Sequence, residues 1–167
     1  DISVKAMEKV RRVAPDVRFD IYGFGPMKSS LAKMIQSLHL QDTVFLYEPL
    51  SLEGIAKKMA TAQLGIVPKR ADNFGNQAFS TKILEFMILG VPVIASKTKV
   101  DMYYFNDSLL EFFDSGDENS LAQKIIYLYN NKQRRIELTN NAFQFATENS
   151  WINKKTKYFK MIDNLCC

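Results

Sequence analysis

Residues 66–96 constrain the fold of this chain most, because they encode a strand, a polar loop, a helix, a tight turn and a second strand in succession. The apolar run 62–67 is ended by Pro68, whose nitrogen cannot donate to a strand ladder. A second apolar run, 91–95, predicts the strand that follows the helix. This order is typical of one unit of a parallel sheet.

The loop and helix inside this stretch favour an anionic ligand. After the polar loop 69–77, Ser80 is placed to cap a helix that begins at Thr81, and Gly90 is placed to close it. Free amides in the first turn of a helix, at the carboxyl end of a parallel strand, attract negative charge. Glu85 lies about one turn further in, where its carboxylate can accept hydrogen bonds from ligand hydroxyls.

Strands and helices alternate along most of the chain. We expect strands at 17–22, 43–47, 62–67, 91–95 and 109–113, and helices at 2–13, 27–38, 51–61, 81–89, 120–130, 133–148 and 151–165, with a short aromatic element at 102–105. The alternation predicts an α/β fold with a doubly wound, Rossmann-like parallel sheet, as a single domain over 1–167. Because the chain opens on a helix, we expect a first strand to be missing from the sequence.

Composition narrows the classes of partner. The net charge is +4, from 22 Lys and Arg against 18 Asp and Glu, which suits a phosphorylated ligand or an anionic membrane surface. The cations are scattered, so nucleic acid is not an expected partner. His39 is the only histidine, and Cys166 and Cys167 are adjacent, so we expect no metal site. With no apolar run of about 18 residues, we expect a cytoplasmic protein, with peripheral contact at the inner face of a membrane.

Residues 77–96, QAFSTKILEFMILGVPVIAS, resemble the signature of the group 1 (family 4) glycosyltransferases of GT-B fold. That signature has a Glu, seven residues, a second Glu, and a helix of small residues that ends in G-x-P-V-I-A. Other segments resemble the family in the same order, namely 17–26, 42–47, 51–68, 113–128 and 140–151. The resemblance covers nearly the whole chain. It implies the C-terminal, nucleotide-sugar-binding half of a GT-B fold, with the N-terminal acceptor domain absent from this sequence.

The resemblance also implies roles for individual residues. Glu85 would bind the ribose hydroxyls of the donor. Gly23 and Gly25 would line the donor pocket, and Tyr47 would lie near the base. The main chain that would hold the diphosphate is that of Phe79, Ser80 and Thr81.

The sequence departs from the family pattern at two places. Gln77 stands where the first Glu is usual, so a charged acceptor facing the donor sugar becomes an amide, and we take it with Glu85 as a catalytic candidate. Lys82, three residues before the second Glu, can pair its ammonium with the phosphates. The family's opening strand, with the Arg and Lys that clamp the diphosphate, is absent, and Lys69 and Arg70 are the candidate substitutes. That strand would lie between strands 17–22 and 63–67.

The implied reaction is transfer of a sugar, of the hexosyl type, from a nucleotide diphosphate sugar to a glycan, lipid-linked or small-molecule acceptor held by the missing domain. We expect retention of configuration, no metal and no cofactor besides the co-substrate, and no activity of the isolated chain. Two alternatives stay open. One is a non-catalytic or partner-subunit domain of the same fold. The other is a nucleotide-sugar epimerase, disfavoured because epimerases need further acidic and histidine residues and His39 is alone.

Overall fold

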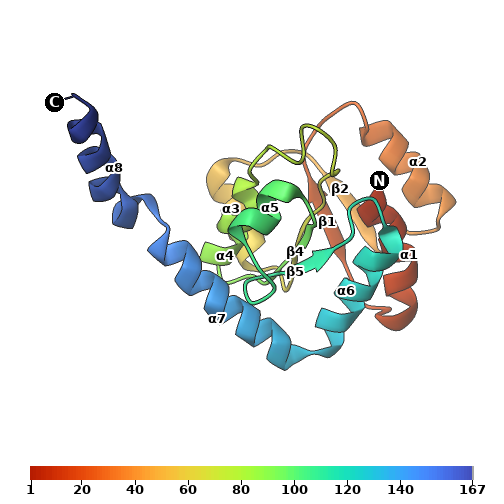
Figure 1. Cartoon of the computed structure of the whole chain (residues 1–167). Coiled ribbons are helices and arrows are strands. Elements are labelled where there is room, and N and C mark those ends of the chain that lie inside the picture. Colours follow the sequence, from red (N-terminus) through yellow and green to blue (C-terminus); the bar gives the residue numbers. More distant parts are fainter. Residues whose placement is uncertain (167) are drawn as a thin grey trace.

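The computed structural model describes the backbone of residues 1–166 and the side chains of residues 1–165, so Cys167 and the side chain of Cys166 lie outside the described residues. Strands and helices alternate up to the last three helices, as the sequence predicts (Figure 1). The elements are α1 (Ile2–Val13), β1 (Phe19–Tyr22), α2 (Lys28–Ser37), β2 (Val44–Tyr47), α3 (Leu52–Ala60), β3 (Gly65–Val67), α4 (Thr81–Ile88), β4 (Val93–Ser96), α5 (Lys99–Tyr104), β5 (Glu111–Phe113), α6 (Glu118–Asn130), α7 (Lys132–Glu148) and α8 (Trp151–Cys166).

All strand pairs are parallel, which confirms the predicted α/β class. β1 pairs with β2, with Phe19 opposite Val44. In a second sheet of order β3-β4-β5, Gly65 lies opposite Val93, and Ile94 opposite Glu111. Because every ladder is parallel, the carboxyl ends of paired strands lie at one edge of each sheet. The loops that follow β1 and β3 therefore emerge at such edges.

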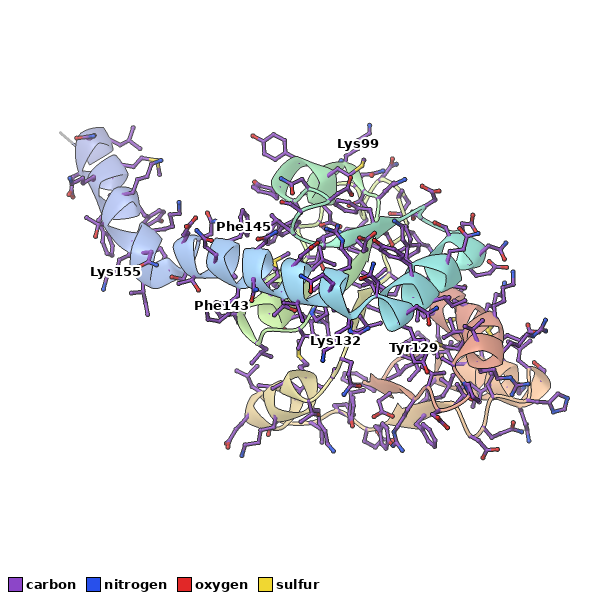
Figure 2. All side chains as sticks on the ribbon, turned by 90° about the horizontal axis from the view of Figure 1, so that it is seen from below. Lys99, Tyr129, Lys132, Phe143, Phe145 and Lys155 are labelled. Carbon is purple, nitrogen blue, oxygen red and sulfur yellow. The ribbon has the colours of Figure 1, made fainter. Side chains whose placement is uncertain are left out.

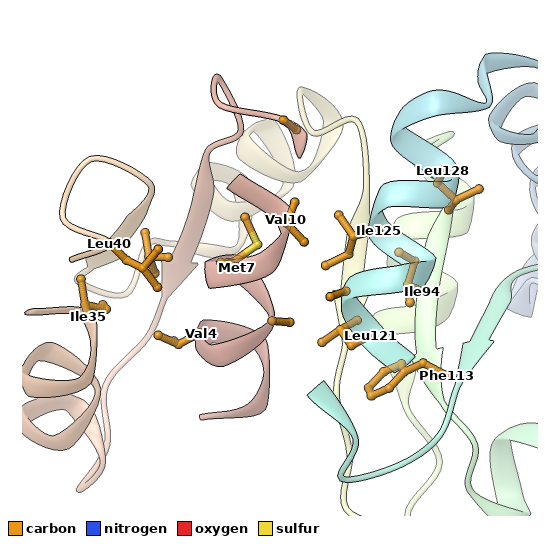
Figure 3. Packing of buried hydrophobic residues seen from close by; sticks show 14 of the residues in the cluster. Val4, Met7, Val10, Ile35, Leu40, Ile94, Phe113, Leu121, Ile125 and Leu128 are labelled. Carbon is orange, nitrogen blue, oxygen red and sulfur yellow. The ribbon is translucent and has the colours of Figure 1, made fainter. Parts of the chain in front are cut away.

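The two sheets are not hydrogen-bonded to each other. β1 and β3 are both edge strands, and no strand among residues 1–166 lies between them. Helix α1 spans the space between the sheets on one side and packs against α6 (Figure 3). Val4, Met7 and Val10 of α1 share one buried cluster with Ile94 of β4. β1 and β3 are not paired with each other, which agrees with the predicted strand order.

Two segments differ from the sequence expectation. The aromatic element expected at residues 102–105 is part of α5, which begins earlier because the Thr98 hydroxyl accepts a hydrogen bond from the Asp101 amide. Trp151, a large aromatic residue of a type that usually packs against other side chains, is 59% exposed on α8. Figure 1 shows why: α8 projects away from the body beyond α7. No helix among the described residues has the length and apolar character needed to cross a bilayer.

Candidate functional site

The N-terminus of α4 leaves a run of amides open. Ser80 holds the N-cap position, but its side chain makes no capping hydrogen bond, contrary to the sequence expectation. Within residues 1–166 the amides of Phe79, Ser80, Thr81 and Lys82 find no acceptor. Successive free amides at a helix start form a concave site for an anion.

Most other helices satisfy their first turn with a side chain. A side-chain cap is present in five helices: Asp1 caps α1, Ser51 caps α3, Thr98 caps α5, Asp117 caps α6 and Asn131 caps α7. Helix α2, like α4, has no side-chain cap. These two helices follow β1 and β3, the strands that flank the open position. Open helix starts are therefore gathered at the edge where a parallel α/β sheet binds its ligands.

Glu85 offers a free carboxylate one turn into α4. It is exposed, and it makes no hydrogen bond or ion pair with the residues that the structure describes. The helix ends two turns in, because Gly90 adopts a φ of 73° and donates its amide to the Met87 carbonyl at 3.1 Å. Glu85 is thus held on a short rigid helix with both carboxylate oxygens available.

Helix α4 lies directly on β3. A methyl group built at Gly65 would meet the ring of Phe86 at 2.6 Å, so the absence of a side chain at this strand position admits the ring. Phe86 follows Glu85 in sequence, and the two side chains leave the helix on different faces. The packing of Phe86 on β3 therefore sets the distance of Glu85 from the sheet.

The loop between β3 and α4 is tied to three neighbouring elements. The Lys69 amide donates to Ser96 Oγ at the end of β4 (2.7 Å), and the Ala71 amide donates to Ser115 Oγ beyond β5 (2.8 Å). Asn76 Oδ1 accepts from the Lys99 amide of α5 at 2.9 Å.

Within this loop, Gly75 is packed so closely that a Cβ would lie 1.8 Å from the Arg70 carbonyl oxygen. The loop has one tight path, and Gly75 permits it.

The two expected cations differ in their surroundings. Lys69 is 17% exposed, and its Nζ lies 2.8 Å from Asp101 Oδ2 and 2.6 Å from the Ala78 carbonyl oxygen. Its ammonium is therefore engaged with the protein, through contacts that no local pattern of residues indicates. Arg70 is 71% exposed and reaches Asp1 Oδ2 at 3.3 Å. Asp101, which the sequence analysis did not single out, is fully buried.

Gly23 and Gly25 follow β1 in open space. Their φ angles are 151° and 158°, and a Cβ at either position would meet no atom within 4 Å. The Gly23 amide donates to the Tyr47 carbonyl at 3.2 Å, so the turn after β1 is joined to the end of β2. Backbone without side chains lets a ligand approach closely here.

Tyr47 lies at the end of β2 in a small aromatic and cationic group. Its ring stacks on Tyr22, with centroids 4.8 Å apart and planes inclined by 16°. Arg18 donates to the Tyr47 hydroxyl and lies 4.1 Å above the Phe45 ring. The hydrogen bond from Arg18 to the Asp20 carboxylate raises the pKa of the guanidinium above its ordinary value.

The remaining predicted site residues cluster around the start of α4. Gln77, Phe79, Thr81 and Lys82 are all exposed. Phe79 packs edge-on against Tyr104, with centroids 5.1 Å apart. Lys82 makes no hydrogen bond or ion pair with the described residues.

The expected residues thus fall in two groups, one after β1 and β2 and one after β3. Across the described part of the chain, no cluster of three or more His, Cys, Asp or Glu side chains suits a metal ion.

Parallel strands with two uncapped helix starts at their carboxyl ends, one of them carrying a free carboxylate, define a Rossmann-like ligand-binding domain. The family model described as "Glycosyl transferases group 1" matches residues 1–145, and the chain belongs to this family. Its fold is that of the C-terminal domains of GT-B glycosyltransferases.

Individual relatives agree with this assignment. The O-antigen biosynthesis glycosyltransferase WclY of Escherichia coli is 26% identical over 171 residues, covering 99% of this chain and 43% of WclY. HepE of Anabaena, solved with UDP and glucose, superposes with a TM-score of 0.84 at 19% identity, covering 98% of this chain and 44% of HepE. The pneumococcal O-GlcNAc transferase GtfA, solved with UDP and GlcNAc, gives 0.83 at 20% identity, with coverages of 99% and 33%. The chain spans less than half the length of these relatives.

Proposed function

We propose that this chain is the donor-binding domain of a glycosyltransferase, and that it holds a nucleotide diphosphate sugar at the start of α4. The observation that carries the proposal is the run of four amides without acceptors, Phe79 to Lys82, beside the unpaired carboxylate of Glu85. Amides and helix dipole suit a diphosphate, whereas a carboxylate suits paired ribose hydroxyls. Relatives of this fold are solved with UDP.

The same groups would assist the chemistry. In transfer of the sugar, negative charge develops on the departing diphosphate, and fixed amides with the exposed Lys82 ammonium can stabilise it. We therefore propose a reaction that needs no metal, with transfer of a hexosyl group and retention of configuration. The acceptor, a glycan, a lipid-linked molecule or a small molecule, would be held by a second domain, so the 167-residue chain alone would bind donor without transferring sugar.

The gap between the sheets divides the proposed site. The open turn Gly23–Gly25 and the Tyr47 group would receive the nucleoside, and the start of α4 would receive the phosphates and ribose. Calorimetric titration with UDP, GDP and ADP tests the proposal. We expect one of these to bind with a dissociation constant in the micromolar range, and failure of all three would contradict donor binding.

Gln77 gives a test of the sugar-facing side. If its exposed amide stands where the family's first Glu contacts the donor sugar, then Gln77→Glu restores a charged acceptor. We expect this change to alter affinity for the nucleotide sugar severalfold, because hydrogen bonds to charged groups are stronger, and to leave affinity for the bare nucleotide unchanged. Parallel titrations with both ligands measure it. Equal shifts for the two would place Gln77 away from the sugar.

Two alternatives use the same binding site. A non-catalytic subunit would bind the nucleotide sugar with Gln77 in place of a carboxylate and would not transfer it. An epimerase would change the sugar without an acceptor. Product analysis after incubating the complete protein with nucleotide sugar and a candidate acceptor separates them, because only a transferase gives a glycosylated acceptor together with free nucleoside diphosphate.

Helix α8 is the element best suited to the peripheral membrane contact. Its side chains from 151 to 165 are all exposed, and they include the aromatic and aliphatic groups of Trp151, Tyr158, Ile162 and Leu165. Residues 151–165 also hold four lysines against one aspartate. Apolar and cationic side chains together suit an anionic lipid surface.

We expect co-sedimentation with phosphatidylglycerol vesicles but not with phosphatidylcholine vesicles. Replacing Ile162 and Leu165 by Ser should abolish it. Absence of binding to both vesicle types would contradict membrane contact through α8 and would favour contact of this helix with another protein.

A further inference from the structure

Asp101 is a buried acid that the proposed binding of the donor does not use. Its side chain is fully buried, and Oδ2 accepts from Thr98 Oγ1 and from Lys69 Nζ, both at 2.8 Å. Oδ1 has no partner within the described residues. A buried carboxylate with one unsatisfied oxygen costs folding free energy. Lys69 and Asp101 are 32 positions apart, so the pair joins the loop after β3 to α5.

The ammonium of Lys69 acts on the loop through a single carbonyl. Besides Asp101, Lys69 Nζ contacts the Ala78 carbonyl oxygen at 2.6 Å. That carbonyl shares one peptide plane with the amide of Phe79. The peptide bond is trans, since no residue of the described chain has a cis bond. The C=O and N–H of a trans peptide point in opposite directions. Holding the Ala78 oxygen toward Asp101 therefore directs the Phe79 N–H away from it.

The Phe79 amide is the first of the four that lack an acceptor. We infer that Lys69 and Asp101 are positioning residues, which orient the Phe79 N–H so that it can donate to a phosphate of the donor. In this arrangement Lys69 serves the anion site without touching the ligand, and Asp101 fixes the direction of the ammonium. The inference rests on the proposed function. It gives Lys69 an indirect role, in place of the direct contact with the diphosphate that the sequence suggests.

The test compares a nucleoside diphosphate with its parent nucleoside, using whichever of UDP, GDP and ADP binds best. In the variant Lys69→Met, which keeps the length of the side chain, we expect about tenfold weaker binding of the diphosphate, the value of one well-placed hydrogen bond to a charged group. Binding of the nucleoside, which has no phosphate, should not change. General damage to the domain would weaken both ligands.

Lys97→Met is the matched control. Lys97 also forms an ion pair beside a strand end, with Asp114 at 2.7 Å, but both partners are exposed. This variant should bind both ligands normally. The double variant Lys69→Met with Asp101→Asn removes both buried charges, so it stays folded if Lys69→Met alone does not. It should bind the diphosphate as Lys69→Met does, because the two residues act through one carbonyl.

Amide hydrogen exchange provides a readout without ligand. Exchange at Ala78, whose amide donates to the Phe74 carbonyl at 2.8 Å, should be faster in Lys69→Met than in Lys97→Met, because the ammonium no longer holds the Ala78 carbonyl. An unchanged ratio of diphosphate to nucleoside affinity in folded Lys69→Met, or in the double variant, would overturn the positioning role and leave the proposed function standing. Failure of the unaltered protein to bind any of the three diphosphates would overturn both.

Discussion

Glu85→Gln should weaken binding of the nucleoside diphosphate by roughly 10- to 150-fold, equivalent to about 1.5–3 kcal/mol. The substitution keeps the size of the side chain and one acceptor oxygen, but it removes the charge that strengthens hydrogen bonds from ribose hydroxyls. Glu85 has no partner among the described residues, so its replacement should leave the free energy of unfolding nearly unchanged. Calorimetric titration and urea unfolding measure the two quantities.

Glu53→Gln is the control for this change. Glu53 is also an exposed helical carboxylate, and it pairs with Lys57 on α3 at 2.6 Å. The control should bind nucleotide normally. A further comparison with the 2′-deoxy nucleotide tests the contact itself, because a ligand without the 2′-hydroxyl should discriminate less between Glu85 and Gln. Undiminished affinity in Glu85→Gln would remove Glu85 from the ribose site.

The second large effect concerns stability. We propose that a parallel strand from outside residues 1–166 occupies the position between β1 and β3 and raises the free energy of unfolding by roughly 5 kcal/mol, from about five backbone hydrogen bonds at about 1 kcal/mol each. Phe19 and Gly23 donate toward β2, at the Thr43 and Tyr47 carbonyls. Because residues of a parallel strand alternate in direction, Ile21 also faces β2, whereas Asp20 and Tyr22 face the open position.

Comparing the 167-residue chain with a version extended before Asp1 tests this proposal. Urea unfolding should show the gain in stability. Hydrogen exchange should show new protection at Asp20, Tyr22 and Ile66, with Ile21 protected in both forms. An extension with proline at alternate positions is the control, since proline cannot donate to a ladder. Equal stability and equal exchange in the extended and unextended chains would refute the proposal.

The sequence predicted the elements well because their signals are local. Apolar runs ended by Pro68 or followed by glycines mark β1 and β3, and Ser51 caps α3 as its position suggests. Glu85 could be singled out because spacing along one helix sets its place. The parallel pairing of the strands followed from their alternation with helices along the chain.

Other features depend on contacts between distant residues. The Lys69–Asp101 pair joins the loop after β3 to helix α5 and leaves no local pattern in the sequence. Ser80 looks like a cap by position, but the path of the loop gives it a φ of −97° and a ψ of 96°, and its hydroxyl bonds none of the first amides. Trp151 reads as a core residue by type, whereas its exposure follows from the direction in which α8 leaves α7. In Figure 2, seen from below, α8 with Lys155 likewise continues beyond the end of α7 and away from the body.

The contact of the Phe86 ring with Gly65 of β3 sets the distance between the sheet and the proposed ribose carboxylate of Glu85. An ordinary van der Waals contact needs 3.4–4 Å, and a methyl group at position 65 would stand only 2.6 Å from the ring. A single added carbon beneath the sheet-facing side of α4 would therefore lift the helix by about 1 Å. Glu85 would rise with it. The height of the Glu85 carboxylate above the sheet is thus set by Gly65, the residue beneath α4 that has no side chain.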